Sequence, residues 1–447
     1  MFSLLFDWAC DSDNLANLCN RRRWNKIKRL IPQKKDTWNF EETINGYAPL
    51  HICALCGEID TIQAFYEQIP DIHKDIRTTG GHSAFQIAAI FGQTELVRWF
   101  LENGASIEDR DNHGNTALIL TSAKGYLNTM KCLLEHGCSL DEKNNAGQSC
   151  LLFAAEKGQM NTVKWLLENG CSLDDKSNVG ETCIMRAIYG GNLKMVQYLH
   201  QRGCSLTDRT IGGNTCLLLA AYCGHLHIIK WLLSNGSDIT EKNNADVTSL
   251  LYASVRGHKN VVEHLLNNGS SINEKNNAGS NCFLEACFGG HLDLMKYLFQ
   301  RGCSLESKTN DERTCMMYAA TNGQLETMKW LYSKGCSLEG STSSNETCLT
   351  LASAKGHLEV VKWLVENGCS LEEIDYNGTC IMNAAKGKHL DVVLWMLSNG
   401  ASIEENTFMN FSGEIKTSNQ SCADILKKNG QFEEVKNIFL SKSGRNK

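Results

Sequence analysis

The chain has 447 residues, of which 44 are basic and 50 acidic, so its net charge at pH 7 is −6. An apolar fraction of 42% is enough to bury a core and excludes a chain that is disordered by composition. So mild a charge argues against a general nucleic-acid-binding or membrane-binding surface.

The N-terminal stretch, MFSLLFDWACDSD (residues 1–13), has no basic segment before its apolar residues and no small-residue cleavage pattern. We therefore predict no signal peptide. The sequence also lacks a run of about 18 apolar residues, so we expect no transmembrane helix and no membrane insertion. These features favour a cytoplasmic protein, with the nucleus as the alternative.

The first predicted elements are two helices within residues 11–45, LANLC and WNKIKRLI. The residues between them, RRRW, stand where a turn glycine is expected from the pattern that follows. We interpret residues 1–45 as a degenerate N-terminal capping repeat with a basic stretch.

From residue 46 to residue 403 the sequence repeats with a period of about 33 residues. The letters GCSL recur at 137–140, 170–173, 203–206, 302–305, 335–338 and 368–371, and GSDI (236–239) and GSSI (269–272) are near-copies. In this register a turn residue opens each of twelve repeats: Gly46, Gly81, Gly114, Gly147, Gly180, Gly213, Asp246, Gly279, Glu312, Asn345, Asn377 and Asn419. Glu312 is the residue least suited to a left-handed turn.

Each repeat predicts two helices. A helix N-cap residue stands two positions after the turn residue: Ser83, Thr116, Ser149, Thr182, Thr215, Thr248, Asn281, Thr314, Thr347, Thr379 and Ser421, with Ala48 followed by Pro49 as the exception. CLLFAAEKG (150–158) then predicts a first helix, and MNTVKWLLENG (160–170) a second helix that ends at Gly170. One repeat cannot bury its apolar face alone, so stacked repeats must share a core.

The end of the chain departs from the period. We expect residues 404–418 to form an extended loop, residues 419–440 a C-terminal capping repeat with a more polar second helix, and residues 441–447 a tail. Polar end repeats keep a stacked array in solution.

The segments GYAPLHICALCG (46–57), GNTCLLLAAYCGH (213–225) and EVVKWLVENGC (359–369) resemble the ankyrin-repeat pattern. That pattern reads G-x-T-P-L-H-x-A-A-x-x-G-H, followed by V-V-x-x-L-L-x-x-G-A. The match covers residues 46–440 in twelve copies. The resemblance implies an all-α ankyrin-repeat solenoid of about twelve helix-turn-helix units plus the degenerate N-terminal capping unit.

Two departures from the family pattern affect the expected bonding. Cys-Leu or Cys-Ile mostly replaces Pro-Leu-His, and only His51 keeps the histidine, so the bonds that this histidine makes between repeats are expected to be missing elsewhere. In the eleventh repeat, which is one residue shorter, KGKH (386–389) displaces the usual Gly-His.

Cysteine is frequent, with 21 residues, and 14 of them occupy two positions of the repeat. Six lie in GCSL, and eight follow the N-cap: Cys150, Cys183, Cys216, Cys282, Cys315, Cys348, Cys380 and Cys422. Equivalent positions in neighbouring repeats lie about 8–10 Å apart, farther than the Cα separation of about 7 Å that a disulfide tolerates. We therefore predict small buried thiols in a reducing compartment.

A metal site is the alternative for the cysteines. Only Cys53 and Cys56 have the C-x₂-C spacing, and no second pair completes a zinc site, so we expect no cofactor. No local Cys–His signature predicts a catalytic cysteine.

An aromatic residue recurs in the second helices: Trp99, Trp165, Tyr198, Trp231, Tyr297, Trp330, Trp363 and Trp395. These residues form either a binding strip or a row of packing residues, and the pattern favours packing.

Partners of this family usually bind the concave side, which the first helices and loop tips form. The resemblance places the residues after the Ala-Ala pair on that side and implies a partner-binding set of Phe91, Tyr189, Tyr222, Arg256 and Phe288. The last four lie in consecutive repeats, and tyrosine and arginine are frequent hot-spot residues. The alternative is an ordinary scatter of exposed aromatic residues.

The segment NRRRWNKIKRLIPQKK (20–35) is a second candidate site, with a basic patch of Arg21, Arg22, Arg23, Lys26, Lys28 and Arg29. It could bind an acidic partner, an anionic lipid or a nucleic acid, or act as a nuclear import signal. The alternative is a solvated capping face. Because the rest of the chain is acidic, we do not expect nucleic acid as the partner.

We predict a monomeric, non-catalytic scaffold or adaptor that binds another protein on its concave helix and loop-tip surface. The segments outside the repeats are too short for a catalytic domain. The alternatives are a binder of an acidic partner or nucleic acid through the basic segment, and a microbial effector that acts on a host protein.

Overall fold

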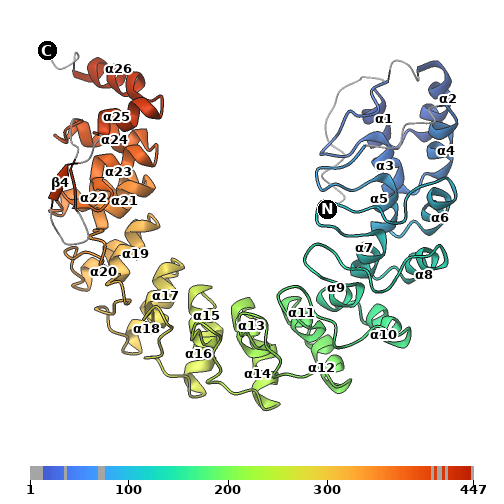
Figure 1. The fold of residues 1–447 in the computed structure, drawn as a ribbon, viewed down its shortest axis with the longest axis horizontal. Helices are drawn as coiled ribbons and strands as arrows, with labels where there is room; N and C mark the ends of the chain where they lie inside the picture. The colour runs from blue at the N-terminus through green and yellow to red at the C-terminus, as the bar shows by residue number, and fades with distance from the viewer. Residues whose placement is uncertain are drawn as a thin grey trace. The chain divides into compact units, whose positions relative to one another are not determined.

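The computed structural model describes residues 14–34, 38–68, 76–403, 407–409, 415–417 and 421–443. These residues form 26 helices and two short antiparallel hairpins (Figure 1). The chain divides into an N-terminal part, residues 1–219, and a C-terminal part, residues 220–447, and each is described by itself. Residues 1–13, for which we predict no signal peptide, lie outside the described residues, as do Asn419 and residues 444–447.

The helices follow one another in pairs. In the N-terminal part they are α1 (Leu15–Asn20), α2 (Trp24–Lys34), α3 (Pro49–Cys56), α4 (Ile59–Gln68), α5 (Ala84–Ile90), α6 (Thr94–Glu102), α7 (Ala117–Lys124), α8 (Leu127–Glu135), α9 (Cys150–Glu156), α10 (Met160–Glu168), α11 (Cys183–Tyr189) and α12 (Leu193–Gln201). The boundary between the parts falls within α13 (Cys216–Cys223). In the C-terminal part they continue as α14 (Leu226–Ser234), α15 (Ser249–Val255), α16 (Lys259–Asn267), α17 (Cys282–Phe288), α18 (Leu292–Gln300), α19 (Cys315–Thr321), α20 (Leu325–Ser333), α21 (Cys348–Lys355), α22 (Leu358–Glu366), α23 (Cys380–Lys386), α24 (Leu390–Ser398), α25 (Cys422–Lys428) and α26 (Phe432–Ser443).

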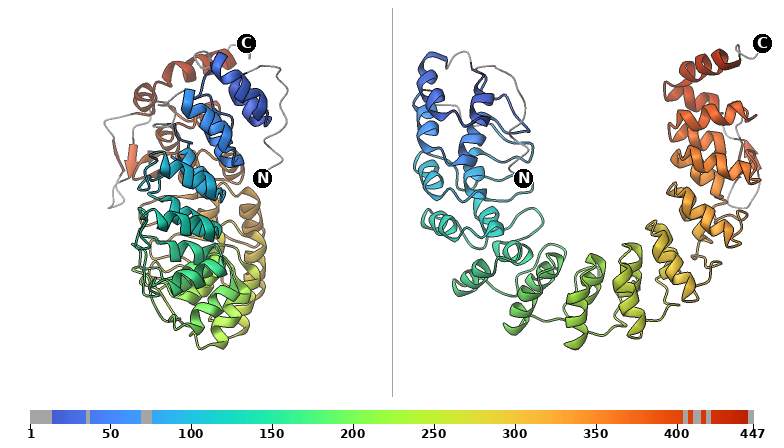
Figure 2. Two further views of the ribbon diagram at one scale, coloured as in Figure 1. Left: turned by 90° about the vertical axis from the view of Figure 1, so that its right-hand side faces the viewer. Right: turned by 180° about the vertical axis from the view of Figure 1, so that it is seen from behind.

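Within each part the helices form two layers (Figures 1 and 2). The odd-numbered helices, the first of each pair, pack on one another: α3 on α5, α7 and α9 in turn, and α15 on α17, α19 and α21 in turn. The even-numbered helices form the second layer, as in the contacts of α6 with α8 and of α22 with α24. Leu118, Ile184 and Phe283, on the first helices α7, α11 and α17, are among the fully buried side chains of the core. The predicted all-α repeat fold is confirmed.

The turn residues behave as predicted in all described repeats but one. Asp246, Glu312 and Asn345 adopt left-handed φ angles of 58°, 64° and 59° in place of glycine. The prediction for Asn377 is wrong, because Gly378 takes the positive φ, 131°. The strands β1 (Ile374–Asp375) and β2 (Gly378–Thr379) explain this shift: Asp375 pairs with Gly378, which moves the turn by one residue.

Side chains at the start of the second helices supply hydrogen bonds between repeats. Imidazole rings or side-chain amides at these positions donate to carbonyls near the end of the first helix of the previous repeat. The pairs are Gln93 to Leu55, Gln159 to Ala123, His258 to Tyr222, His291 to Val255, His357 to Thr321 and His389 to Ala354. In KGKH the displaced glycine leaves Lys388 with a φ of 64°, and His389 keeps its bond. At the position of His51, Leu152 and Leu284 have no polar side chain that could bond to a neighbouring repeat. Gln86 at this position does donate to the carbonyls of Asp109 and Asn115, so the expectation that such bonds are missing elsewhere is wrong there.

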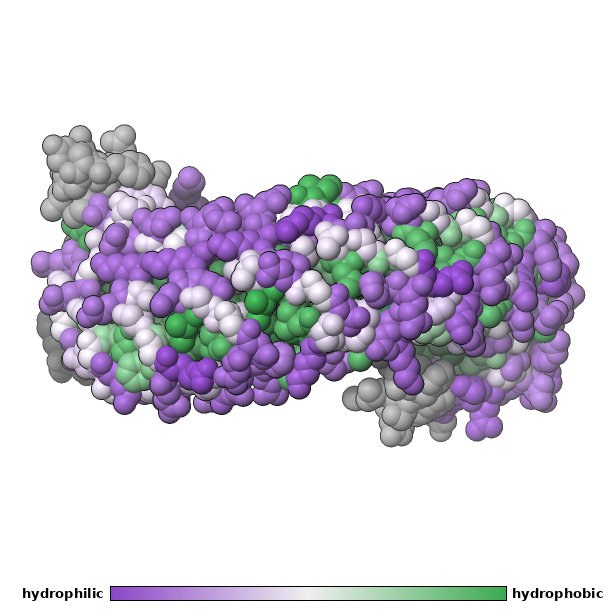
Figure 3. Space-filling view, turned by 90° about the horizontal axis from the view of Figure 1, so that it is seen from below, coloured by the Kyte–Doolittle hydropathy of each residue, from purple (hydrophilic) through white to green (hydrophobic). Residues whose placement is uncertain are grey.

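The aromatic residues of the second helices are all half-buried. Trp330 packs edge-on against Phe299 and Trp363 against Tyr332, with ring centroids 5.9 and 5.5 Å apart. The space-filling view from the side of α14 and α16 shows apolar atoms as separate patches among hydrophilic ones (Figure 3). Half-burial and this surface favour the packing interpretation.

The segment predicted as an extended loop, residues 404–418, contains a hairpin. Its strands β3 (Thr407–Met409) and β4 (Ile415–Thr417) pair antiparallel, with Phe408 opposite Lys416, and β3 contacts β1 and β2. Strand β3 therefore lies against the hairpin that opens the eleventh repeat. None of the described helices is long and apolar enough to cross a membrane.

Candidate functional site

The predicted partner-binding residues all lie at the ends of first helices. Phe91 follows α5 and Tyr189 ends α11, and both are half-buried. In the C-terminal part, Tyr222 lies in the last turn of α13, Arg256 caps α15 and Phe288 ends α17. All three of these are exposed, Tyr222 to 37% and Phe288 to 52%.

Tyr222, Arg256 and Phe288 lie around one open hollow of about 550 Å³, which Val255, Gly289 and His291 complete. The Arg256 guanidinium lies over the Tyr222 ring, 4.9 Å from its centroid, so a cation–π contact holds the two side chains together. The hollow thus combines a positive charge with exposed aromatic surface.

Two tyrosines of the first helices hold the exposed rings in place. Tyr252 packs edge-on against Tyr222, with centroids 5.4 Å apart, and Tyr318 packs edge-on against Phe288 at 5.5 Å. Neither tyrosine is among the site residues predicted from the sequence. A signal was present, because each stands six residues after its turn residue, on the helix face that also carries the exposed residues.

Histidines fix the backbone under the hollow. The Nε2 atoms of His258 and His291 lie 3.0 Å from the carbonyl oxygens of Tyr222 and Val255. A Cβ atom at the left-handed Gly257 would lie 2.4 Å from the His291 ring, so a larger residue there would displace the ring. These bonds set the position from which Arg256 extends.

The charge of Arg256 is not neutralised locally. Among the residues that the structure describes, no carboxylate forms an ion pair with Arg256. Arg186, in the N-terminal part, has the opposite environment: it also lies over a tyrosine, Tyr189, at 5.3 Å, but it forms ion pairs with Glu156 and Glu181. Of these two arginines, only Arg186 is paired with carboxylates in the described part of the chain.

Family comparisons agree with the repeated pairs of helices. The model described as "Ankyrin repeats (3 copies)" matches residues 15–111, 85–177, 151–243, 250–339 and 337–407, and "Ankyrin repeats (many copies)" matches 224–266. The chain belongs to the ankyrin-repeat family. The first of these matches begins at residue 15 and therefore includes α1 and α2. Ankyrin repeats are generally protein–protein interaction modules and typically non-catalytic. A comparison with curated proteins found no match.

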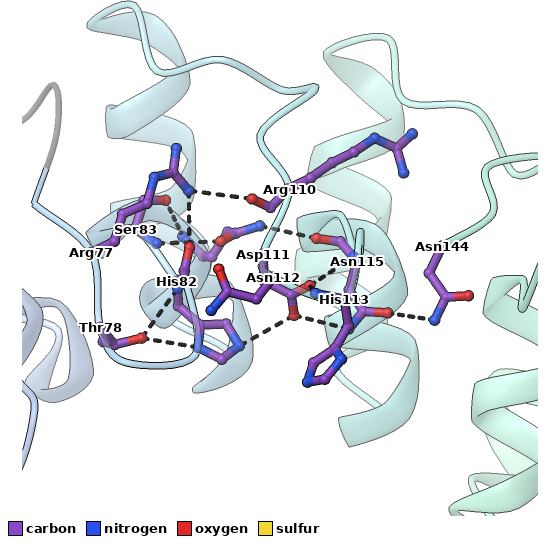
Figure 4. Close-up of polar contacts among 12 residues, drawn as sticks. Arg77, Thr78, His82, Ser83, Arg110, Asp111, Asn112, His113, Asn115 and Asn144 are labelled. Carbon is purple, nitrogen blue, oxygen red and sulfur yellow. Dashed lines mark hydrogen bonds and ion pairs between the residues drawn. The ribbon is translucent and has the colours of Figure 1, made fainter. Parts of the chain in front are cut away.

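A polar cluster between two ankyrin repeats has the composition of a catalytic triad (Figure 4). His82 lies between a hydroxyl and a carboxylate: its Nδ1 is 3.1 Å from Thr78 Oγ1, and its Nε2 is 3.4 Å from Asp111 Oδ2. A hydroxyl, an imidazole and a carboxylate in contact are the parts that activate a nucleophile.

The hydrogen bonds of this cluster indicate a structural role. Thr78 Oγ1 accepts from the backbone N–H of His82, and Asp111 Oδ1 accepts from those of His113 and Asn115. In the loops of the following ankyrin repeats, a side-chain oxygen likewise accepts from the backbone N–H four residues later. The donors are Gln148, Glu181, Asn214, Val247, Ser280, Arg313 and Glu346. Burial also lowers the pKa of His82, despite the nearby Asp111. We interpret the three side chains as a turn cap that joins two repeats.

The basic patch lies in the turn between α1 and α2 and on α2. Arg21, Arg22 and Arg23 are exposed in the turn between α1 and α2, and Arg22 takes the left-handed φ, 52°, predicted for a turn glycine. Arg29 is exposed and Lys26 half-buried. Lys28 is partly neutralised, because its Nζ lies 3.3 Å from Asp60 Oδ2.

The C-x₂-C pair has no metal-binding environment. Cys53 is buried and Cys56 half-buried, and the described residues contain no cluster of three or more His, Cys, Asp or Glu side chains that could hold a metal ion. Burial raises the pKa of both thiols, which disfavours the thiolate that a metal needs.

Proposed function

We propose that this chain is a non-catalytic adaptor that binds a partner protein on its first-helix and loop-tip surface, centred on Tyr222, Arg256 and Phe288. The observation that carries the proposal is the Arg256 guanidinium, which lies over an exposed tyrosine and forms no ion pair with a carboxylate among the described residues. Tyrosine and arginine supply much of the binding energy in protein interfaces. Phe91 and Tyr189 are proposed as further contacts along the first helices.

The chemistry of the hollow defines the partner segment. A guanidinium fits a carboxylate through two parallel hydrogen bonds, and Phe288 offers an apolar surface beside it. We therefore expect the partner to present an Asp or Glu side chain next to an apolar residue. Glu156 and Glu181 supply this carboxylate to Arg186 from within the chain.

The test starts from random peptides displayed on phage and selected on the immobilised full-length protein. We expect the enriched peptides to share an acidic residue adjacent to an apolar one. A synthetic peptide of that sequence is then titrated against wild type and variants by fluorescence anisotropy. Arg256→Gln and Tyr222→Ala should each cost about 2 kcal/mol, roughly a 30-fold rise in Kd.

Lys355→Gln is the matched control, because Lys355 is exposed and occupies the same repeat position as Arg256. Its Kd should stay within about twofold of wild type, as expected for an exposed charge outside the interface. Equal losses in Arg256→Gln and Lys355→Gln would remove the hollow as the site. Enriched peptides without acidic residues would overturn the proposed partner chemistry.

The exposed turn Arg21–Arg23 is a second candidate surface for an acidic partner. Charge reversal of these three arginines should weaken such a partner, and the effect should fade at high salt. Binding to random duplex DNA that is equally sensitive to the reversal would instead favour a nucleic-acid role.

We also propose a monomer in a reducing compartment, the cytoplasm or the nucleus. All twenty described cysteines are free thiols, which supports this compartment.

A further inference from the structure

In some repeats of the described chain, two cysteines of the same repeat lie in direct contact, and Cys315 and Cys336 share a hydrogen bond of this kind. The Sγ atoms of Cys183 and Cys204 are 3.5 Å apart in the N-terminal part, and those of Cys282 and Cys303 are 3.8 Å apart in the C-terminal part. The first cysteine of each of these two pairs begins a first helix, α11 or α17. The second follows the second helix of the same repeat, α12 or α18.

The predicted separation of about 8–10 Å applies to cysteines at the same position of neighbouring repeats, so it does not cover these contacts. The two cysteines of a pair occupy different positions of one repeat, and the packing of its two helices brings them together. The four residues are buried free thiols, as predicted, but the sequence pattern did not reveal that they lie in pairs.

We propose that Cys183–Cys204 and Cys282–Cys303 are two-thiol sites that a peroxide oxidises to intrachain disulfides. The pairs are thiols in a reducing compartment, and oxidation links the start of one helix to the residues after its partner helix. Disulfides of this kind in the cytosol are transient and serve redox sensing.

The reaction balances with hydrogen peroxide as the oxidant. The Cys204 thiolate attacks one peroxide oxygen and the O–O bond breaks, which leaves a sulfenic acid and a hydroxide that takes up the proton from Cys204. The Cys183 sulfur then attacks the sulfenic sulfur. The S–S bond forms, the S–O bond breaks, and the second water leaves with the proton of Cys183. The two sulfurs together lose two electrons, and the peroxide gains them.

Burial and hydrogen bonding divide the roles within each pair. Cys183 and Cys282 are fully buried, whereas Cys204 and Cys303 remain 8% and 5% exposed. The hydrogen bond from Cys183 lowers the pKa of Cys204, and that from Cys282 lowers the pKa of Cys303. The more accessible cysteine of each pair is thus the better thiolate, and the buried one is positioned to resolve the sulfenic acid.

Other repeats of the same chain provide natural controls. Cys216 starts α13 just as Cys183 starts α11, but Ser237 occupies the second position of its repeat. The repeat of Cys138 keeps the cysteine after its second helix but has Ala117 in place of the cysteine at the start of its first helix. Neither repeat can form the proposed disulfide.

The experiment treats the reduced full-length chain with hydrogen peroxide, blocks the remaining thiols with N-ethylmaleimide and identifies linked peptides by mass spectrometry. We expect Cys183–Cys204 and Cys282–Cys303 crosslinks, each short of two hydrogens and reversed by dithiothreitol. They should be at least about tenfold more abundant than any crosslink to Cys216. If N-ethylmaleimide still alkylates Cys183 and Cys204 completely at a peroxide dose that has already oxidised Cys216, the two thiols have not formed a disulfide and the proposal is overturned.

Two further measurements make the test specific. Cys204→Ser should remove the first crosslink and leave the second, and serine is tolerated at this position because Ser237 and Ser270 occupy it elsewhere. Oxidation in urea should give mixed pairings. If the native and unfolded chains give the same pairings, the fold does not specify the sites and the proposal fails.

Discussion

At the scale of single residues, the third position of the first helix shows how one substitution changes the bonding between repeats. His51 Nδ1 accepts the backbone N–H of Ala48, 3.1 Å away, and the imidazole is fully buried. In the next repeat Gln86 accepts from the N-cap amide in the same way and also donates to the carbonyls of Asp109 and Asn115. Glutamine thus performs the role of the histidine without a titratable ring.

His51 should make the first repeat sensitive to acid. Burial lowers its pKa to about 4 from the ordinary 6.5, so the unfolded chain binds a proton at a higher pH than the folded chain does. The stability that this site contributes is therefore complete above pH 6.5 and is lost as the pH falls towards 4. Relative to His51→Gln, the wild type should lose up to about 3 kcal/mol over this window.

Hydrogen exchange of the α3 amides in both proteins, at pH 7 and at pH 4.5, measures this difference. The exposed His113, replaced by glutamine, is the control and should leave α3 unchanged. If the α3 amides lose the same amount of protection between pH 7 and pH 4.5 in wild type and in His51→Gln, His51 is not the source of the acid sensitivity.

At the scale of one element, the turn before each first helix selects the residue by its backbone angle. Glycine meets the left-handed requirement without cost, whereas Asp246, Glu312 and Asn345 meet it with a Cβ atom present. The repeats that these residues open remain predicted weak points. The repeat of Asn377 is not one of these weak points, because Gly378 takes the positive φ angle there and no side chain is strained.

Glu312→Gly should stabilise its repeat by up to about 1 kcal/mol, because it removes the left-handed strain. The substitution also deletes the ion pair with Lys308, but that pair is exposed and contributes little. The reciprocal change, Gly279→Ala, should destabilise, since its Cβ would lie 2.4 Å from Asn310 Oδ1. Hydrogen exchange of α19 and α17 reports the two effects, and lower protection of α19 in Glu312→Gly would refute the strain argument.

At the scale of the molecule, stability should be a sum of repeats and their contacts, because within each part the helix pairs pack on their sequence neighbours. The last pair, α25 and α26, packs on α23 and α24 and ends the stack. Its first helix buries Cys422, Ile425 and Leu426. This contact supports the predicted capping role of residues 419–440.

Deletion of residues 419–447 should expose the outer face of α23 and α24. We expect hydrogen-exchange protection to fall most in these helices and progressively less from α21 back to α15, with a loss of solubility. Deletion of residues 444–447 alone is the control. A uniform loss of protection across the C-terminal part would show global coupling in place of nearest-neighbour coupling.

The sequence alone determined the period, the two helices per repeat, their N-caps and most turn positions, because these depend on backbone angles and local hydrogen bonds within one repeat. It also placed Tyr222, Arg256 and Phe288 at the ends of first helices. Only the tertiary structure decided that the Arg256 guanidinium lies over the Tyr222 ring, that Cys183 contacts Cys204, and that the turn at residue 377 shifts to Gly378. Such contacts depend on how helices rotate and pack against one another, and that geometry follows from the packed core of many repeats, which no single 33-residue segment encodes.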